Sequence, residues 1–373
     1  MRIGVPREIK RAELRVGLTP DAVVELTRAG HEVLVESGAG AGIDASDADY
    51  ERSGARIVAA ARDVFDQAEL LVKVKEPQAE ERALLRPHHT LFGYLHLAPD
   101  PEQTKDLIAS GATCIAYETV TDAAGGLPLL APMSQVAGRL SIQAGAACLE
   151  ASRGGAGVLL GGVPGVAPAK VVVLGGGVVG ANAIQMALGL GADVTVLDRN
   201  AKVLERLAER FGAALRTVFS TDATLERHVV EADLVIGAVL LKGAEAPHLV
   251  TAEMVRRMRR GSVLVDVAID QGGCFETSRP TTHDDPTFVV DGVVHYCVAN
   301  MPGAVPKTAT AALNHATLPA ILRLAGDGID RALMRDPHLR NGLNVIEGLV
   351  TEPAVAEALG YDYVDPLLAL EAH

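Results

Sequence analysis

The sequence predicts an α/β protein with mostly parallel sheets and two domains. Short apolar runs alternate with helix-like segments in two separate blocks, a pattern typical of strands joined by crossover helices. The length of 373 residues suits two domains of about 100–200 residues each. The 38 glycines, with aromatic residues at only 3%, favour many tight turns between strands and helices.

The first block spans roughly the first 120 residues. Within it, Thr19 followed by Pro20 marks a helix start, because threonine caps a helix and proline suits its first turn. The predicted strands are residues 3–5, 33–35, 70–74, 90–95 and 113–116, and the predicted helices are residues 21–28, 77–85 and 101–110.

The second block begins at Lys170, after a weakly charged segment from Ser134 to about Arg153 that we interpret as a helix linking two domains. From Pro306 the chain is helical again, and we expect this tail to pack on the first domain. The expected domains are therefore residues 1–128 with 306–373, and residues 129–305. The second block has predicted strands at residues 171–174, 194–197, 215–219, 234–238 and 263–267, and the tail has predicted helices at 309–324 and 353–359.

Composition and charge exclude several classes of protein. Lys and Arg total 34 against 47 Asp and Glu, so the net charge of −13 argues against nucleic-acid binding. The four cysteines form no CxxC pair, which predicts reduced, buried thiols in a cytoplasmic protein. Residues 171–192 carry no charge and are long enough to span a membrane. Because they hold six glycines, a strand, a turn and a buried helix explain them better.

The sharpest motif is the glycine-rich stretch Gly175–Gly180, which follows a predicted strand and opens a helix. Asp198 ends the next strand, 23 residues after Gly175 and near the offset of about 20 found in dinucleotide-binding folds. Gly175 permits the tight turn, Gly177 lets the main chain approach the pyrophosphate, and Gly180 allows close helix–strand packing. The Asp198 carboxylate suits ribose hydroxyls and would repel a 2′-phosphate, so the motif favours NAD over NADP.

Three further polar residues follow predicted strands, where ligands bind in open α/β sheets. Lys75 and His96 follow strands of the first block, and Asp270 follows the strand at residues 263–267. A cleft between the two domains would bring all three together. Each also has a structural interpretation: a solvated lysine, a surface or core histidine, and an aspartate in a turn.

With these residues in hand, the chain resembles the alanine dehydrogenases of the alanine dehydrogenase/pyridine nucleotide transhydrogenase family. The resemblance covers about residues 1–370. It is carried by the stretches GVPRE (4–8), VKVKEP (72–77), LHLA (95–98), MSQVAGR (133–139), GGVPGV (161–166), residues 265–286, and YCVANMPG (296–303).

The resemblance implies two Rossmann-like domains, with the active site in the cleft between them. It also implies an NAD-dependent enzyme of amino-acid catabolism that converts L-alanine reversibly to pyruvate and ammonium. Arg15 and Lys75 would hold the carboxylate and oxo group of the substrate, and His96 and Asp270 would act as acids and bases. The enzyme would be a cytoplasmic homo-hexamer without a membrane or nucleic-acid partner.

The resemblance also assigns cofactor contacts to the second domain. The expected residues are Ser134, Gly175, Gly177, Val178, Val179, Gly180, Asp198, Ser220, Val239, Leu240, Val267, Asp270, Arg279, Val298 and Met301.

The sequence departs from the family in three places. The residues flanking Arg15 differ, Val203 stands where some members have a basic residue, and Arg323 and Asp327 stand where some relatives bind magnesium. We therefore expect no metal.

Two alternatives remain open from sequence. A related dehydrogenase, such as an opine- or lysine-forming enzyme, would act on a different 2-oxo acid and amine. The NAD(H)-binding component of a membrane transhydrogenase would need a membrane partner, but it would not need Lys75 and His96 together.

Overall fold

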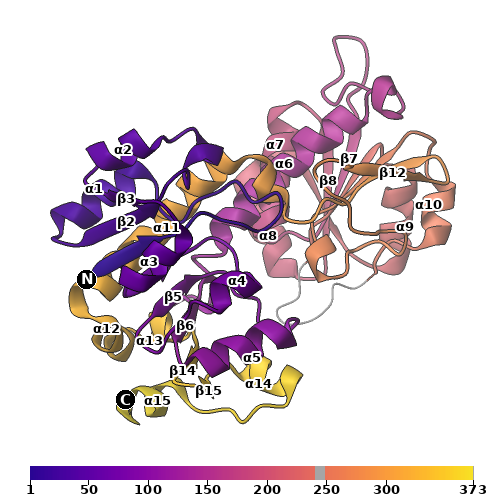
Figure 1. Cartoon of the computed structure of the whole chain (residues 1–373). Helices are drawn as coiled ribbons and strands as arrows, with labels where there is room; N and C mark the ends of the chain where they lie inside the picture. Colours follow the sequence, from indigo (N-terminus) through magenta and orange to yellow (C-terminus); the bar gives the residue numbers. More distant parts are fainter. Residues whose placement is uncertain (240–247, 373) are drawn as a thin grey trace. The chain divides into compact units, whose positions relative to one another are not determined.

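The computed structural model describes residues 1–239 and 248–372, and the chain forms two compact units. Unit 1 comprises Met1–Met133 and Val305–His373, and unit 2 comprises Ser134–Ala304. The sequence analysis draws the corresponding divisions at residues 128/129 and 305/306. The fold class is α/β, with a largely parallel sheet in each unit (Figure 1).

The described part of unit 1 contains an eight-stranded sheet in the order β15-β14-β6-β5-β4-β1-β2-β3. The strands from β6 to β3 are parallel, whereas β14 runs antiparallel to both β6 and β15. In Figure 1 the yellow strands β14 and β15 lie beside the purple strands β5 and β6, although they are distant in sequence. The strands are β1 Arg2–Val5, β2 Glu32–Glu36, β3 Arg56–Val58, β4 Leu70–Val72, β5 Thr90–Gly93, β6 Thr113–Ala116, β14 Leu343–Ile346 and β15 Leu349–Val350.

Local sequence explains where the helices of unit 1 begin and end. Thr19 caps α1 by accepting from the Ala22 amide, and Asp100 caps α5 by accepting from the Gln103 amide. Gly111 ends α5 with φ of 68°, a conformation that glycine adopts without steric cost. The helices are α1 Pro20–Arg28, α2 Asp47–Arg52, α3 Ala61–Gln67, α4 Ala79–Arg82, α5 Pro101–Ser110, α11 Pro306–Asp327, α12 Ile329–Arg335, α13 Pro337–Arg340, α14 Pro353–Leu359 and α15 Pro366–Ala372.

The described part of unit 2 contains a seven-stranded sheet in the order β12-β13-β11-β10-β7-β8-β9, and only β12 is antiparallel to its neighbour. Its strands are β7 Lys170–Leu174, β8 Asp193–Asp198, β9 Leu215–Phe219, β10 Leu234–Gly237, β11 Val263–Asp266, β12 Thr287–Val290 and β13 Val293–Tyr296. Its helices are α7 Val178–Gly189, α8 Ala201–Phe211, α9 Asp222–Glu231 and α10 Ala252–Arg257, and α6 Ala131–Cys148 crosses the division between the units.

The uncharged run of residues 171–192 is a buried strand, a turn and a helix. The side chains of β7 from Val171 to Leu174 are all buried, as expected for a parallel strand covered on both faces. No helix among the described residues is long and apolar enough to cross a membrane. The four cysteines all lie in the described part of the chain, where each is buried and none forms a disulfide.

Two predicted strands end two residues earlier than the sequence suggests. β4 ends at Val72 rather than residue 74, and β5 ends at Gly93 rather than residue 95. In both places a glutamate carboxylate accepts main-chain N–H groups: Glu8 binds Val74, and Glu118 binds Leu95. The side chain thus takes the place of a neighbouring strand, which hydrophobicity alone does not reveal.

The sequence analysis also misplaces or omits shorter elements. The predicted helix at residues 77–85 shrinks to α4, and the linking helix ends at Cys148 rather than near Arg153. The short strand β3 and the hairpin strands β12, β13, β14 and β15 are not among the predicted strands. Such short strands carry few residues from which a period can be detected.

Candidate functional site

The carboxyl edge of the unit 1 sheet gathers Arg15, Lys75 and His96. Lys75 lies just beyond β4, and His96 lies just beyond the adjacent strand β5. Arg15 comes from the segment after β1, which packs closely on β4: a Cβ placed on Gly17 would lie 2.3 Å from the Val72 carbonyl oxygen. The three residues that the sequence analysis assigns to the substrate therefore share one edge.

The Arg15 guanidinium is buried, with 2% of its side chain exposed. Its Nε and Nη2 atoms donate to the two Glu13 carboxylate oxygens at 2.7 and 2.6 Å, and its Nη1 atom lies 3.0 Å from the Met133 Sδ atom. Burial opposes the charged form, but the hydrogen bonds and charge of Glu13 outweigh it and raise the pKa of Arg15. A buried, charged and oriented guanidinium is suited to bind a carboxylate.

His96 has a left-handed backbone with φ of 50°, which is uncommon for a residue other than glycine. Its main-chain N–H donates to Glu118 Oε1 at 2.6 Å, and its Nδ1 atom lies 3.7 Å from the same oxygen. The imidazole stacks on the Tyr94 ring with 5.9 Å between ring centres, and the Tyr94 hydroxyl donates to the Leu129 carbonyl. The ring is nevertheless 46% exposed, so a substrate can reach it.

The glycine-rich loop of unit 2 has the conformation that a dinucleotide requires. Gly175 has φ of 93°, and a Cβ on Gly180 would lie 1.9 Å from the Gly175 carbonyl oxygen. By contrast, a Cβ on Gly177 would meet nothing within 4 Å, so the main chain is open at the start of α7. The Asp198 carboxylate accepts from the Gly176 and Asn200 amides, both at 2.7 Å, and thereby holds the loop against β8.

Asp270 lies in a 3₁₀ turn, Ile269–Gln271, that follows β11. Its two carboxylate oxygens are each 3.3 Å from the main-chain nitrogen of Asn300, whose φ is 55°. Asp266 holds the loop around Asp270 by hydrogen bonds. Its carboxylate accepts from the Ala268 and Cys274 amides and from the Ser278 hydroxyl. Burial raises the pKa of Asp266, although these hydrogen bonds oppose the effect.

Five of the predicted cofactor residues end or follow parallel strands of unit 2 at their carboxyl ends. Parallel strands end at one edge of a sheet, so these residues lie along a single line. Gly175, Asp198, Ser220, Val239 and Val267 end or follow β7, β8, β9, β10 and β11 respectively. In addition, the Ser220 amide donates to the Asp198 carbonyl at 3.0 Å.

The remaining predicted cofactor residues lie elsewhere in unit 2, apart from Leu240, which is outside the described residues. Val178 and Val179 form the first turn of α7, and Ser134 lies in the first turns of α6. Val298 and Met301 are buried in the segment that follows β13. The Arg279 guanidinium lies over the Phe288 ring of β12, 4.2 Å from the ring centre.

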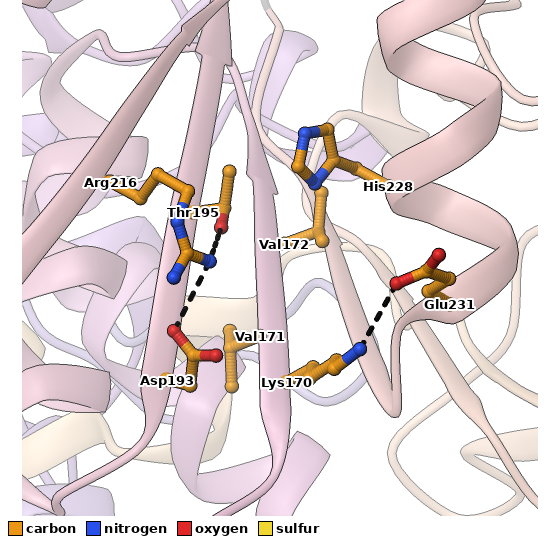
Figure 2. A pocket seen from close by; sticks show the side chains of 8 residues that line it. All are labelled: Lys170, Val171, Val172, Asp193, Thr195, Arg216, His228 and Glu231. Atoms are coloured by element: carbon orange, nitrogen blue, oxygen red, sulfur yellow. Dashed lines mark hydrogen bonds and ion pairs between the residues drawn. The ribbon is translucent and has the colours of Figure 1, made fainter.

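A small hollow of about 80 Å³ lies at the opposite edge of the unit 2 sheet (Figure 2). Lys170, Asp193 and Arg216 line it near the amino ends of β7, β8 and β9. Lys170 pairs with Glu231 at 3.0 Å and Arg216 pairs with Asp193 at 3.4 Å, and dashed lines mark both pairs in Figure 2. Because nucleotides bind beyond the carboxyl ends of parallel strands, this hollow is not the cofactor site.

The sequence analysis does not single out Glu13, Tyr94 or Glu118. Glu118 follows β6, next to β5, so the strand-end rule that selects Lys75 and His96 also applies to it. Tyr94 lies inside a predicted strand and carries no separate signal. Glu13 is recognisable only as an opposite charge two residues before Arg15.

Comparison with known proteins finds two family models that together match most of the chain. The family model described as "Alanine dehydrogenase/PNT, N-terminal domain" matches residues 4–137, and the model of the C-terminal domain matches residues 141–353. The chain is 61% identical to the alanine dehydrogenase of Halomonas elongata over 98% of each chain. It is 53% identical to that of Mycobacterium tuberculosis strain H37Rv over 99% of this chain and 100% of the relative.

Solved structures agree with these matches. An L-alanine dehydrogenase superposes with a TM-score of 0.94 at 53% identity, covering 96% of this chain and 99% of the other. A transhydrogenase from Sinorhizobium meliloti superposes with a TM-score of 0.81 at 25% identity, covering 95% of this chain and all of the other.

Proposed function

The chain belongs to the alanine dehydrogenase/PNT family, and on that premise we propose that it catalyses the reversible NAD-dependent oxidative deamination of L-alanine. The balanced reaction is L-alanine, NAD⁺ and water to pyruvate, ammonium, NADH and a proton. The observation that carries this proposal is the full-length match to alanine dehydrogenases. The positions of Arg15, Lys75 and His96 at one sheet edge agree with it.

The residues of unit 2 fit NAD. The open main chain at Gly177 leaves space for phosphates at the start of α7, where helix N–H groups favour negative charge. Asp198 has oxygens suited to ribose hydroxyls and would repel the 2′-phosphate of NADP. When bound, NAD accepts the hydride, and the other predicted contacts of unit 2 would hold it in place.

The protein residues bind the substrate and move protons. Arg15 pairs with the substrate carboxylate in a charge-assisted hydrogen bond. Lys75 donates to the substrate oxygen and stabilises charge as the carbinolamine forms or breaks down. His96 and Asp270 take and return protons as water attacks the imine and ammonia leaves, a role that imidazole and carboxylate side chains often have in enzymes.

The first test is an absorbance assay of NADH with the purified full-length chain. We expect NADH to be consumed when pyruvate and ammonium are both present, and NADPH to be inert. His96→Ala and Lys75→Ala should lose most but not all of their turnover while NADH still binds, because neither residue lies in unit 2. Loss of NADH binding in these variants would show that the residues support the fold instead.

The transhydrogenase alternative has one observation in its favour, the structural likeness to the Sinorhizobium meliloti protein. It is less well supported, because the alanine dehydrogenase matches at far higher identity. Tight NADH binding without any turnover of pyruvate and ammonium would favour it. Turnover with a larger 2-oxo acid or a second amino acid, in preference to pyruvate and ammonium, would favour an opine-type dehydrogenase.

We also propose that the enzyme is a cytoplasmic homo-hexamer, with substrate bound by residues 1–128 and 306–373 and NAD bound by residues 129–305. Several large apolar side chains of unit 2 are exposed in the segment between α6 and β7, and another is exposed at the end of α7. Leu159, Val163 and Val166 are 65%, 52% and 63% exposed, and Leu190 is 50% exposed. A Cβ on Gly161 would lie 2.2 Å from the Leu190 carbonyl oxygen, so these residues form one surface that a second copy would cover.

A further inference from the structure

Lys73 is the most deeply buried cation of the described unit 1 core, with none of its side chain exposed. Its ammonium nitrogen lies 3.2 Å from Glu8 Oε2 and 2.7 Å from Glu81 Oε1. Both glutamate side chains are also almost fully buried. Burial opposes the charge on Lys73, but the two carboxylates outweigh burial and raise its pKa, so the side chain remains an ammonium.

Each carboxylate uses its second oxygen to hold the main chain. Glu8 Oε1 accepts from the Val74 amide at 2.7 Å, and Glu81 Oε2 accepts from the Gln78 amide at 2.8 Å. Lys75 lies between these two anchored amides. One ammonium therefore links two carboxylates that hold the backbone immediately before Lys75 and three residues after it.

Other contacts also hold the segment after β4 in place. The Val74 carbonyl accepts from the Tyr94 amide at 3.1 Å, and the Pro77 carbonyl accepts from Arg82 at 3.2 Å. Glu76 forms an ion pair with Lys10. The Lys73 cluster differs from these contacts because all three of its charged side chains are buried, and a charge buried without a partner is strongly unfavourable.

We propose that Lys73 is a positioning residue for Lys75: through Glu8 and Glu81, its ammonium sets the backbone path from which Lys75 reaches the substrate. The role assigned to Lys75 rests on the proposed function. The cluster itself touches no substrate. It keeps the segment after β4 in a single conformation, so that Lys75 loses little freedom on binding, as preorganised sites require.

The test is a double-mutant cycle on the full-length enzyme. The triple variant Glu8→Gln, Lys73→Met and Glu81→Gln keeps an amide oxygen for each anchored N–H but removes the charges that join them. We expect its kcat/KM for pyruvate to fall at least about tenfold, with the KM for NADH unchanged. Lys75→Ala should then lower kcat/KM less in the triple variant than in the unaltered chain, and the two factors should differ at least about tenfold. If Lys75→Ala lowers kcat/KM by the same factor in both backgrounds, within about twofold, the proposal is overturned.

A matched control uses Arg323→Met with Asp336→Asn. Asp336 also forms an ion pair, with Arg323, and accepts main-chain N–H groups, from His338 and Leu339. It does so between α11 and α13, away from the segment after β4. In this control background, Lys75→Ala should lower kcat/KM by the same factor as in the unaltered chain. If the triple variant does not fold, Glu81→Gln alone replaces it, because Gln still caps α4.

A second measurement does not depend on turnover. Acetylation of the Lys75 amine by an activated ester, followed by mass spectrometry, reports how accessible and how reactive that amine is. We expect its rate to change at least about threefold in Glu81→Gln and not in the control. An unchanged rate overturns the proposal. Absence of turnover in the unaltered chain, with the rate change present, would instead count against the proposed function alone.

Discussion

At the scale of single residues, buried or half-buried carboxylates hold the main chain beside each residue proposed to bind or transform the substrate. Glu13 accepts from the Arg15 amide as well as from its guanidinium, and Glu118 accepts from the Leu95 and His96 amides. Hydrogen bonds to a charged acceptor are stronger than those between neutral groups. Such bonds can hold backbone conformations that would otherwise be rare, including the left-handed conformation of His96.

We predict that Glu118→Ala lowers kcat by up to about 100-fold, because His96 loses the carboxylate that accepts its main-chain N–H and lies 3.7 Å from its ring nitrogen. Glu118→Gln should be much less impaired, since it keeps an oxygen within reach of the His96 N–H. Steady-state kinetics of both variants, with NADH affinity as a check of unit 2, provide the measurement. A kcat in Glu118→Ala equal to that of the unaltered enzyme would show that His96 does not need this partner.

Acid should destabilise unit 1 through His89. This histidine is buried, its Nδ1 atom accepts from the Arg86 amide at 2.9 Å, and its Nε2 atom lies 2.8 Å from the Phe65 carbonyl. Burial lowers the pKa of His89, although the Phe65 carbonyl opposes this shift. As the pH falls below about 6.5, the unfolded chain therefore takes up a proton that the folded chain resists, and the free energy of unfolding decreases.

The measurement is urea unfolding at about pH 7.5 and about pH 5.5, where one such proton changes stability by at most about 1.4 kcal/mol per pH unit. His89→Gln should be less stable at neutral pH but should lose less stability on acidification. His315→Gln, at an exposed position on α11, serves as the control and should leave the difference between the two pH values unchanged. Equal acid sensitivity in His89→Gln would contradict the prediction.

At the scale of elements, the turn between β7 and α7 combines two glycines with different tasks. Gly180 has no room for a side chain, because its Cβ would collide with the Gly175 carbonyl. Gly177 has room, and its φ of −67° suits any residue. Gly180 is therefore required by packing within the protein, whereas Gly177 faces open space that we assign to the cofactor phosphates.

We predict that two alanine substitutions in this turn affect different properties, one the stability and the other the binding of NADH. Gly180→Ala should lower the melting temperature and disturb the turn. Gly177→Ala should keep the melting temperature but weaken NADH binding by about tenfold or more, which is about 1.4 kcal/mol. Thermal unfolding without ligand and NADH titration separate the two effects. Unaltered NADH affinity in Gly177→Ala would argue against phosphates at the start of α7.

At the scale of the whole molecule, each unit has its own sheet and its own buried core. In unit 1 that core includes Val345, Val350 and Val355 of the C-terminal part, packed with residues of the first 120 such as Leu71 and Leu91. The C-terminal segment completes the sheet by adding β14 to β6. Unit 1 therefore depends on both ends of the chain.

We predict that Leu159→Glu with Val166→Glu reduces the mass of the native assembly in light scattering. The buried interface of a hexamer would otherwise cover these apolar side chains, and a buried unpaired carboxylate is costly. Val289→Glu, on an equally exposed valine of β12, is the control and should leave the mass unchanged. A single species of unaltered mass in the double variant would place the interface elsewhere.

The sequence by itself determined the fold class, the alternation of strands and helices, and the residues that follow strand ends. These features follow from local patterns: apolar periodicity, capping residues such as Thr19, and a glycine motif followed by Asp198 at the expected distance. The family resemblance added Arg15, whose role no local pattern indicates. Most strands of the two parallel sheets were predictable because their buried runs are continuous.

Only the tertiary structure decided how these residues are held. Arg15 pairs with Glu13, Glu118 accepts from the Leu95 and His96 amides, and Lys73 lies buried between Glu8 and Glu81. In each case a carboxylate accepts the hydrogen bonds. A charged side chain has the same sequence signature whether it is solvated or buried with a partner. Apart from Glu13, which lies two residues before Arg15, these partners depend on which strands become neighbours, and that is settled by packing across the whole sheet rather than by any local pattern.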